Sequence, residues 1–130
     1  MIRVTLNGPG EVVPAATVEG RMTRELLIGR DGGICVWCGR EPWTADLTAE
    51  HLLPRSRRGR TLPENLAVAC RACNKRRRTK PVVAYVRSQR QAGLAPRVDL
   101  LEAALTRLSG CASPVHAEYA ARQLALLDRL

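Results

Sequence analysis

Cys35-Val36-Trp37-Cys38 and Cys70-Arg71-Ala72-Cys73 are the two stretches that decide the fold of this 130-residue chain. Each is a CxxC pair, and four thiolates in two such pairs can close a tetrahedral Zn²⁺ site. A closed site would bring residue 38 next to residue 70 and pin the 31 residues between them into one loop. The pattern therefore predicts a structural zinc ion with four ligands, Cys35, Cys38, Cys70 and Cys73. The fifth cysteine, Cys111, is left over, and we expect it to be a small buried residue.

The positive charge of the chain is concentrated in one segment. The net charge is +9, and residues 51–80 contain ten basic residues and one acidic residue, whereas the rest of the chain carries 11 of each. A solvated surface is the ordinary explanation of a charge run. The concentration of this charge between and just after the two cysteine pairs favours binding of a polyanion such as nucleic acid instead. The predicted phosphate contacts are Arg55, Arg57, Arg58, Arg60, Lys75, Arg76, Arg77 and Arg78.

Composition and the positions of glycine and proline residues divide the chain into three regions. Residues 1–19 form an extension with one expected strand at 2–6, residues 20–80 form a domain around the cysteine pairs, and residues 81–130 form a helical region. No stretch approaches the ~18 apolar residues of a membrane span, so we expect no membrane partner. The odd cysteine count and the absence of an apolar leader suggest metal-bound thiolates in a reducing cytoplasm.

Within residues 20–80 the periodicity predicts a helix, two strands and a helix. The expected ranges are 20–31, 48–54, 66–69 and 71–78. Alternation along the first strand places neighbouring side chains on opposite faces. A bulge would therefore be needed to bring Glu50 and His51 to one ion.

The second half of the sequence predicts three helices with apolar stripes that suit core packing. Thr79 is the expected cap of the first, over residues 80–92. Asp99 is the expected cap of the second, which Gly110 closes. Ser113-Pro114 opens the third in the N-cap and N1 pattern.

His51 is the stronger functional candidate of the two histidines. A lone histidine is more often a packed or surface residue than a catalytic one. His51, however, follows an acid, precedes the basic loop and lies between the two cysteine pairs. His116 has no such neighbours, and we expect it on the surface.

Three runs together resemble the zinc-bound form of the HNH endonuclease family. The resemblance covers roughly residues 20–80. The runs are Glu50-His51-Leu52-Leu53-Pro54-Arg55-Ser56-Arg57-Arg58-Gly59, then Pro63-Glu64-Asn65-Leu66, and Cys70-Arg71-Ala72-Cys73-Asn74-Lys75.

The resemblance implies an α+β fold built on a ββα-metal core and cleavage of DNA rather than RNA. His51 would be the general base that activates water, and Asn65 would orient His51 or pin the loop. Glu50 and Asn74 would bind one catalytic Mg²⁺ or Mn²⁺. Two positions depart from the family, which usually has Asp in place of Glu50 and often has two glycines in place of Arg58-Gly59.

Two other classes of function stay open on the sequence alone. The first is a zinc-stapled nucleic-acid-binding module without catalytic turnover. The second is an interaction protein whose apolar C-terminal helices dock a protein partner or a second copy of the chain.

Overall fold

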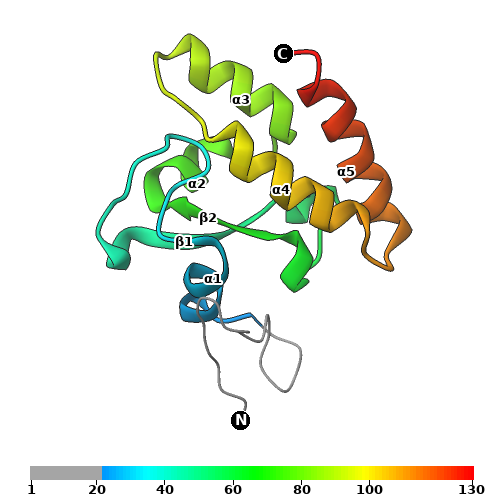
Figure 1. Ribbon diagram of the computed structural model, residues 1–130, viewed down its shortest axis with the longest axis horizontal. Coiled ribbons are helices and arrows are strands. Elements are labelled where there is room, and N and C mark those ends of the chain that lie inside the picture. The colour runs from blue at the N-terminus through cyan, green and yellow to red at the C-terminus, as the bar shows by residue number, and fades with distance from the viewer. Residues whose placement is uncertain (1–21) are drawn as a thin grey trace.

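The computed structural model describes residues 22–130, and the strand expected at 2–6 lies outside this range (Figure 1). Short 3-10 turns connect several of the elements. The helices and strands are, in order, α1 (Arg24–Asp31), β1 (Leu47–His51), β2 (Leu66–Cys70), α2 (Arg71–Arg77), α3 (Val82–Gln91), α4 (Val98–Ser109) and α5 (Pro114–Leu127).

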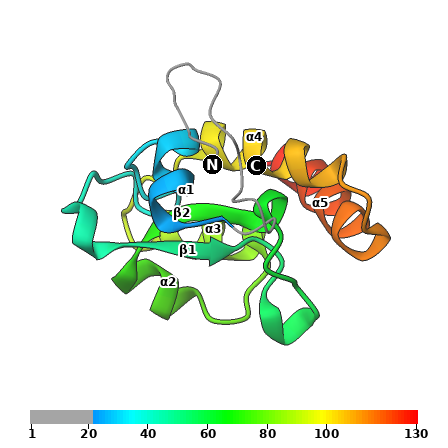
Figure 2. The same ribbon diagram turned by 90° about the horizontal axis from the view of Figure 1, so that it is seen from below.

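A two-stranded antiparallel ribbon and the helix after it form the centre of the fold. β1 pairs with β2 from Leu47↔Cys70 to His51↔Leu66, and α2 follows β2 without a linker. Helices α1 and α2 cover opposite faces of this ribbon (Figure 2). The predicted order of strand, strand and helix and the α+β class are confirmed.

Strand β1 ends at His51, three residues before the predicted end at residue 54. The reason is Asn65, whose side-chain oxygen accepts the Leu53 N–H at 2.9 Å, in the place of a strand partner. The side chains of Leu52 and Leu53 are then buried in the core. The first helix likewise starts later than predicted, at Arg24, because Thr23 caps it by accepting the Leu26 N–H.

The three C-terminal helices are present, but two of their predicted caps are wrong. α3 starts at Val82 after Pro81 rather than after Thr79. Asp99 lies inside the first turn of α4, where it pairs with Arg97 at 2.7 Å. Pro81 is the N-cap residue of α3, so Thr79 precedes the cap, whereas Arg97 is the N-cap residue of α4, so Asp99 follows the cap.

Ser113 and Pro114 do occupy the N-cap and N1 positions of α5, as the sequence predicted. The Ser113 hydroxyl pairs with a histidine side chain rather than with a backbone N–H of the helix. None of the helices within residues 22–130 is long and apolar enough to cross a membrane.

One hydrophobic core joins the cysteine-rich region to the C-terminal helices. Trp37 is fully buried and meets Tyr85 edge-on, with ring centroids 5.1 Å apart. Leu52 belongs to the same cluster as Leu101 and Leu105 of α4. Cys111 is half-buried at the edge of this cluster rather than buried. The core therefore crosses the predicted boundary at residue 80.

Candidate metal and catalytic site

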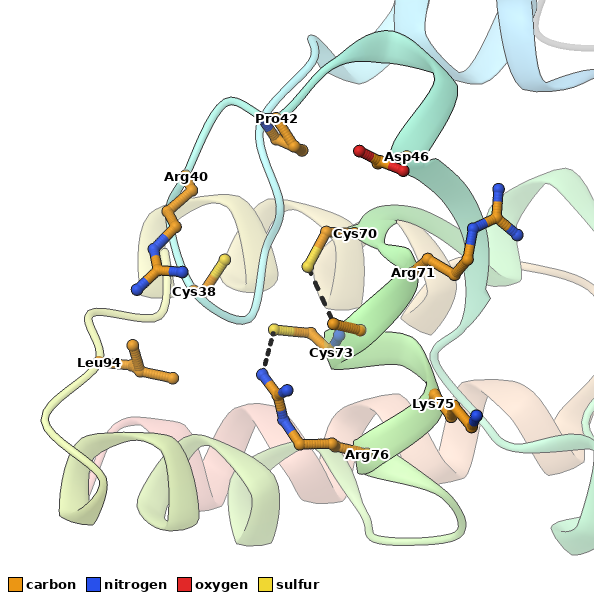
Figure 3. A pocket seen from close by; sticks show the side chains of 11 residues that line it. Cys38, Arg40, Pro42, Asp46, Cys70, Arg71, Cys73, Lys75, Arg76 and Leu94 are labelled. Atoms are coloured by element: carbon orange, nitrogen blue, oxygen red, sulfur yellow. Dashed lines mark hydrogen bonds between the residues drawn. The ribbon is translucent and has the colours of Figure 1, made fainter.

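The four cysteines of the two CxxC pairs, here called knuckles, meet at one point, as the sequence predicted. Their Sγ atoms all lie within 4.8 Å of one another. Cys35 and Cys38 come from the turn after α1, Cys70 ends β2, and Cys73 lies in α2. Three of these sulfurs converge beside a pocket of about 660 Å³ (Figure 3). This donor set and spacing fit a tetrahedral Zn²⁺.

Hydrogen-bond donors surround the sulfur atoms and would support thiolates. The backbone N–H groups of Trp37 and Cys73 donate to the Sγ atoms of Cys35 and Cys70, at 3.4 and 3.5 Å. The side chain of Arg76 donates to Cys73 Sγ at 3.6 Å (Figure 3). The side chain of Gln89 donates to the same sulfur at 3.7 Å.

Without a cation, two of the clustered thiols resist ionisation, those of Cys35 and Cys73. Burial acts to raise the pKa of the Cys70 thiol as well, but hydrogen bonds from Cys73 and from the other thiols lower it below its ordinary value. Burial raises the pKa of Cys35 to about 11. Burial and the neighbouring thiols raise the pKa of Cys73 further still. A divalent ion among the sulfurs would reverse this effect, because a coordinated thiol loses its proton. A metal ion at this cluster would therefore bind with release of thiol protons.

Glu50 is buried and already has two partners. Only 5% of its surface is exposed. Its Oε2 accepts the indole N–H of Trp37 at 2.8 Å, and its Oε1 lies 3.7 Å from a guanidinium nitrogen of Arg77. Burial raises the pKa of this carboxyl, although Arg77 and Trp37 act in the opposite direction. A carboxylate has about four acceptor sites, so these two contacts do not use its full acceptor capacity.

Asn74 lies against β1 with its amide oxygen available. Its Nδ2 donates to Thr48 Oγ1 at 2.9 Å and to the Ala49 carbonyl at 3.3 Å. These contacts use the NH₂ group and leave Oδ1 as the atom that could bind a hard cation. They also place Asn74 beside the two residues that directly precede Glu50 in the strand.

His51 is the last residue of β1 and is half-buried. Its Nε2 lies 2.9 Å from Thr61 Oγ1. Burial, followed by the positive charges of Arg55 and Arg77, lowers the pKa of the imidazole below its ordinary 6.5. The ring is therefore neutral at pH 7, which is the form that can accept a proton.

The bulge that would bring Glu50 and His51 to one ion is not present. The ladder pairs residues 47–51 with residues 66–70 one to one. An unbroken strand places neighbouring side chains on opposite faces. Glu50 therefore shares the face of Thr48, toward α2, whereas His51 lies on the other face at the end of the ladder.

Asn65 is fully buried and pins the loop between the two strands. Its Oδ1 accepts the Leu53 N–H, and its Nδ2 donates to the carbonyls of Leu53 and Arg60, at 3.1 and 2.9 Å. Of the two roles that the resemblance implied for Asn65, these contacts match pinning of the loop.

The same loop depends on Gly59 and strains Arg58. A Cβ at residue 59 would lie 1.7 Å from the Leu53 carbonyl oxygen, so only glycine fits there. Arg58 adopts the left-handed conformation, with φ 73°. That conformation costs about 1 kcal/mol for a residue with a Cβ. This cost explains why glycine suits the position and why arginine there is a departure.

Arg77 corrects one prediction, because it is fully buried and cannot contact a phosphate. Its guanidinium donates to the carbonyls of His51, Leu52 and Lys80. It also lies over the Trp37 ring, 5.1 Å from the centroid. The other seven predicted contacts are exposed: Arg55, Arg57, Arg58, Arg60, Lys75, Arg76 and Arg78.

His116 was expected on the surface, and this expectation is wrong. Only 1% of the residue is exposed, and its Nε2 accepts the backbone N–H of Arg60 at 3.0 Å. Tyr119, from the same helix, donates its hydroxyl to the Leu52 carbonyl at 2.8 Å. Both side chains therefore hydrogen-bond the backbone of the loop between the strands. No local sequence signal predicts these contacts, because each partner is more than 50 residues away.

The two knuckles, the ribbon and α2 together define a ββα unit with four cysteines placed so that they could hold a metal ion. Residues 35–87 match the family model of the HNH endonucleases, which confirms the resemblance noted in the sequence. The match ends inside α3, so α4 and α5 lie beyond it. No curated protein matches the chain.

Proposed function

We propose that this protein is a metal-dependent HNH endonuclease or nickase that hydrolyses phosphodiester bonds of DNA. The observation that carries the proposal is the place of His51, at the end of β1 and directly before the pinned loop, within the segment that matches the family. The loop also holds four exposed arginines that can bind phosphates, Arg55, Arg57, Arg58 and Arg60.

In this proposal each group has a distinct task. His51 takes a proton from the attacking water. The exposed arginines hold the phosphate backbone without reading its sequence. Glu50 and Asn74 would hold a Mg²⁺ or Mn²⁺ ion, which supplies stabilisation of charge on the phosphate and the leaving oxygen. The four cysteines would hold Zn²⁺, which would fix the turn after α1 to the junction of β2 and α2.

Cleavage of supercoiled plasmid tests the proposal directly. Wild type should nick or linearise the plasmid with Mg²⁺ or Mn²⁺ and not with chelator. His51→Ala should lose at least ~10²-fold in rate, the usual scale for a positioned general base. Its zinc content and DNA affinity should remain at the wild-type level, which excludes unfolding as the cause. A fully active His51→Ala protein would refute the mechanism.

A second candidate, the zinc-stapled binding module without turnover, is favoured by the surroundings of Glu50. Its carboxylate is already bound by Trp37 and Arg77, and it lies on the opposite face of the ribbon from His51. Asn74→Ala separates the two candidates. If a cation is bound, this change should reduce cleavage, and added Mg²⁺ should partly restore it. Wild type that binds DNA but cleaves neither DNA nor RNA with any divalent ion would establish the binding module.

A further inference from the structure

Helix α5 contacts the active-site loop directly beside His51. The Tyr119 hydroxyl donates to the carbonyl of Leu52, the residue that follows His51, at 2.8 Å. The hydroxyl oxygen of Tyr119 also accepts the Val82 N–H at 3.1 Å and a guanidinium N–H of Arg77 at 3.3 Å. Arg77 in turn donates to the His51 carbonyl. Tyr119 therefore belongs to a buried network that holds the backbone on which the imidazole stands.

A second contact from α5 lies at the far end of the same loop. His116 Nε2 accepts the Arg60 N–H at 3.0 Å, so this nitrogen carries no proton. The proton of the neutral ring is then on Nδ1, which donates to Ser113 Oγ at 2.7 Å. The ring is almost fully buried, and this backbone contact fixes its orientation and tautomer.

The two contacts bracket residues 52–60, the segment that carries the basic loop. Asn65 ties the same segment from the other side, at Leu53 and Arg60. The backbone is thus held near both ends from two directions. One set of bonds comes from the ββα unit, and the other comes from a helix that begins 27 residues after the family match ends.

We infer that α5 is part of the active-site scaffold, with Tyr119 and His116 as positioning residues for the loop of His51. The inference rests on the proposed nuclease function. A displacement of about 1 Å in a catalytic group can lower a rate by about 10²-fold. Loss of the Tyr119 contact should therefore act mainly on kcat, because it adjoins His51. Loss of the His116 contact should act mainly on KM, because it adjoins the arginines.

Tyr119→Phe is the decisive variant, because it removes one hydroxyl and keeps the ring. Gln123→Leu is its matched control, since Gln123 lies on the same helix, is buried, and bonds the Val83 N–H of α3 rather than the loop. Tyr119→Phe removes the three hydrogen bonds of the hydroxyl and Gln123→Leu removes one, so both changes should lower Tm. Only Tyr119→Phe should lower kcat, by about 10-fold or more, with KM nearly unchanged.

His116 is tested by a pair of variants and by a measurement that needs no activity. His116→Gln keeps an acceptor near the position of Nε2, whereas His116→Leu removes it. Amide hydrogen exchange of residues 52–60 should accelerate at least about 10-fold in His116→Leu, the effect of losing a bond of roughly 1.4 kcal/mol. It should return toward the wild-type rate in His116→Gln, and KM should follow the same order.

Unchanged kcat in Tyr119→Phe, together with unchanged loop exchange in His116→Leu, would overturn the inference. Equal loss of kcat in Tyr119→Phe and Gln123→Leu would also overturn it, because general destabilisation would then explain the loss. A wild type that cleaves nothing would refute the proposed function and the catalytic part of this inference together. The exchange measurement would still decide whether α5 holds the loop.

Discussion

The buried guanidinium of Arg77 donates a hydrogen bond to the backbone carbonyl of His51 from beneath the ribbon. It also contacts the Glu50 carboxylate and the Trp37 ring. One side chain of α2 therefore links the strand that carries two candidate catalytic residues to the first cysteine knuckle. Arg77 therefore connects the cysteine cluster to the strand end that precedes the loop of residues 52–60.

Arg77→Met should destabilise the protein by about 3–5 kcal/mol. The change leaves the buried Glu50 carboxylate without its cation and leaves several carbonyl oxygens without a donor, and each effect is costly in the core. Urea denaturation followed by circular dichroism measures the loss. The control is Arg78→Met, the exposed neighbour, which should change stability by no more than about 0.5 kcal/mol. Similar losses of stability in the two variants would show that the buried contacts of Arg77 do not stabilise the fold.

Cys70→Ser should remove bound zinc and unfold the core. Three remaining thiolates bind zinc more weakly, and binding of a structural zinc is coupled to folding. Metal analysis of wild type should give one Zn²⁺ per chain. Cys111→Ser is the control, because Cys111 lies outside the cluster and should retain the metal. Folded wild-type protein without zinc would contradict the assignment.

Binding to duplex DNA should weaken steeply with salt. With six phosphate contacts the slope of log K against log salt concentration would be about −5. Arg58→Gln should reduce the magnitude of the slope by about 1, whereas Arg87→Gln, an exposed arginine of α3 outside the basic segment, should leave it unchanged. Fluorescence anisotropy between about 50 and 200 mM salt gives the slope. Affinity that does not change over this range would rule out the electrostatic prediction.

The protein should lose stability as the pH falls below 6.5, the ordinary pKa of histidine, because His116 is buried. Burial, with a smaller contribution from Arg60, lowers the pKa of this histidine below 6.5 in the folded state. The unfolded chain therefore binds the proton first, and stability that is present above pH 6.5 is lost as pH falls from 6.5 to the folded-state pKa.

The difference between wild type and His116→Gln isolates this effect from other titrating groups. Thermal unfolding measured from pH 7.5 down to pH 5 should show a steeper loss of Tm in wild type than in the variant. Parallel curves over that range would show that His116 does not titrate differently on folding.

The sequence by itself determined the cluster of four cysteines and the order of elements around it. Cys35, Cys38, Cys70 and Cys73 come in pairs whose spacing is a local property, and so is the periodicity that predicted two strands, α2 and the C-terminal helices. The sequence also singled out His51 as a candidate, because its acidic neighbour and the basic loop adjoin it in the chain; its role stays a prediction. These signals are short-range, so they can be read before any folding is known.

Only the tertiary structure decided which charged and polar side chains are buried. Arg77 looks like its exposed neighbours in sequence, yet it is the one that meets His51 and Leu52, 26 and 25 residues away. His116 looks isolated, yet Arg60 reaches it across 56 residues. Burial of such groups is favourable only where partners from distant segments satisfy them. No local pattern can report those partners, because packing of the helices against the ribbon brings them together.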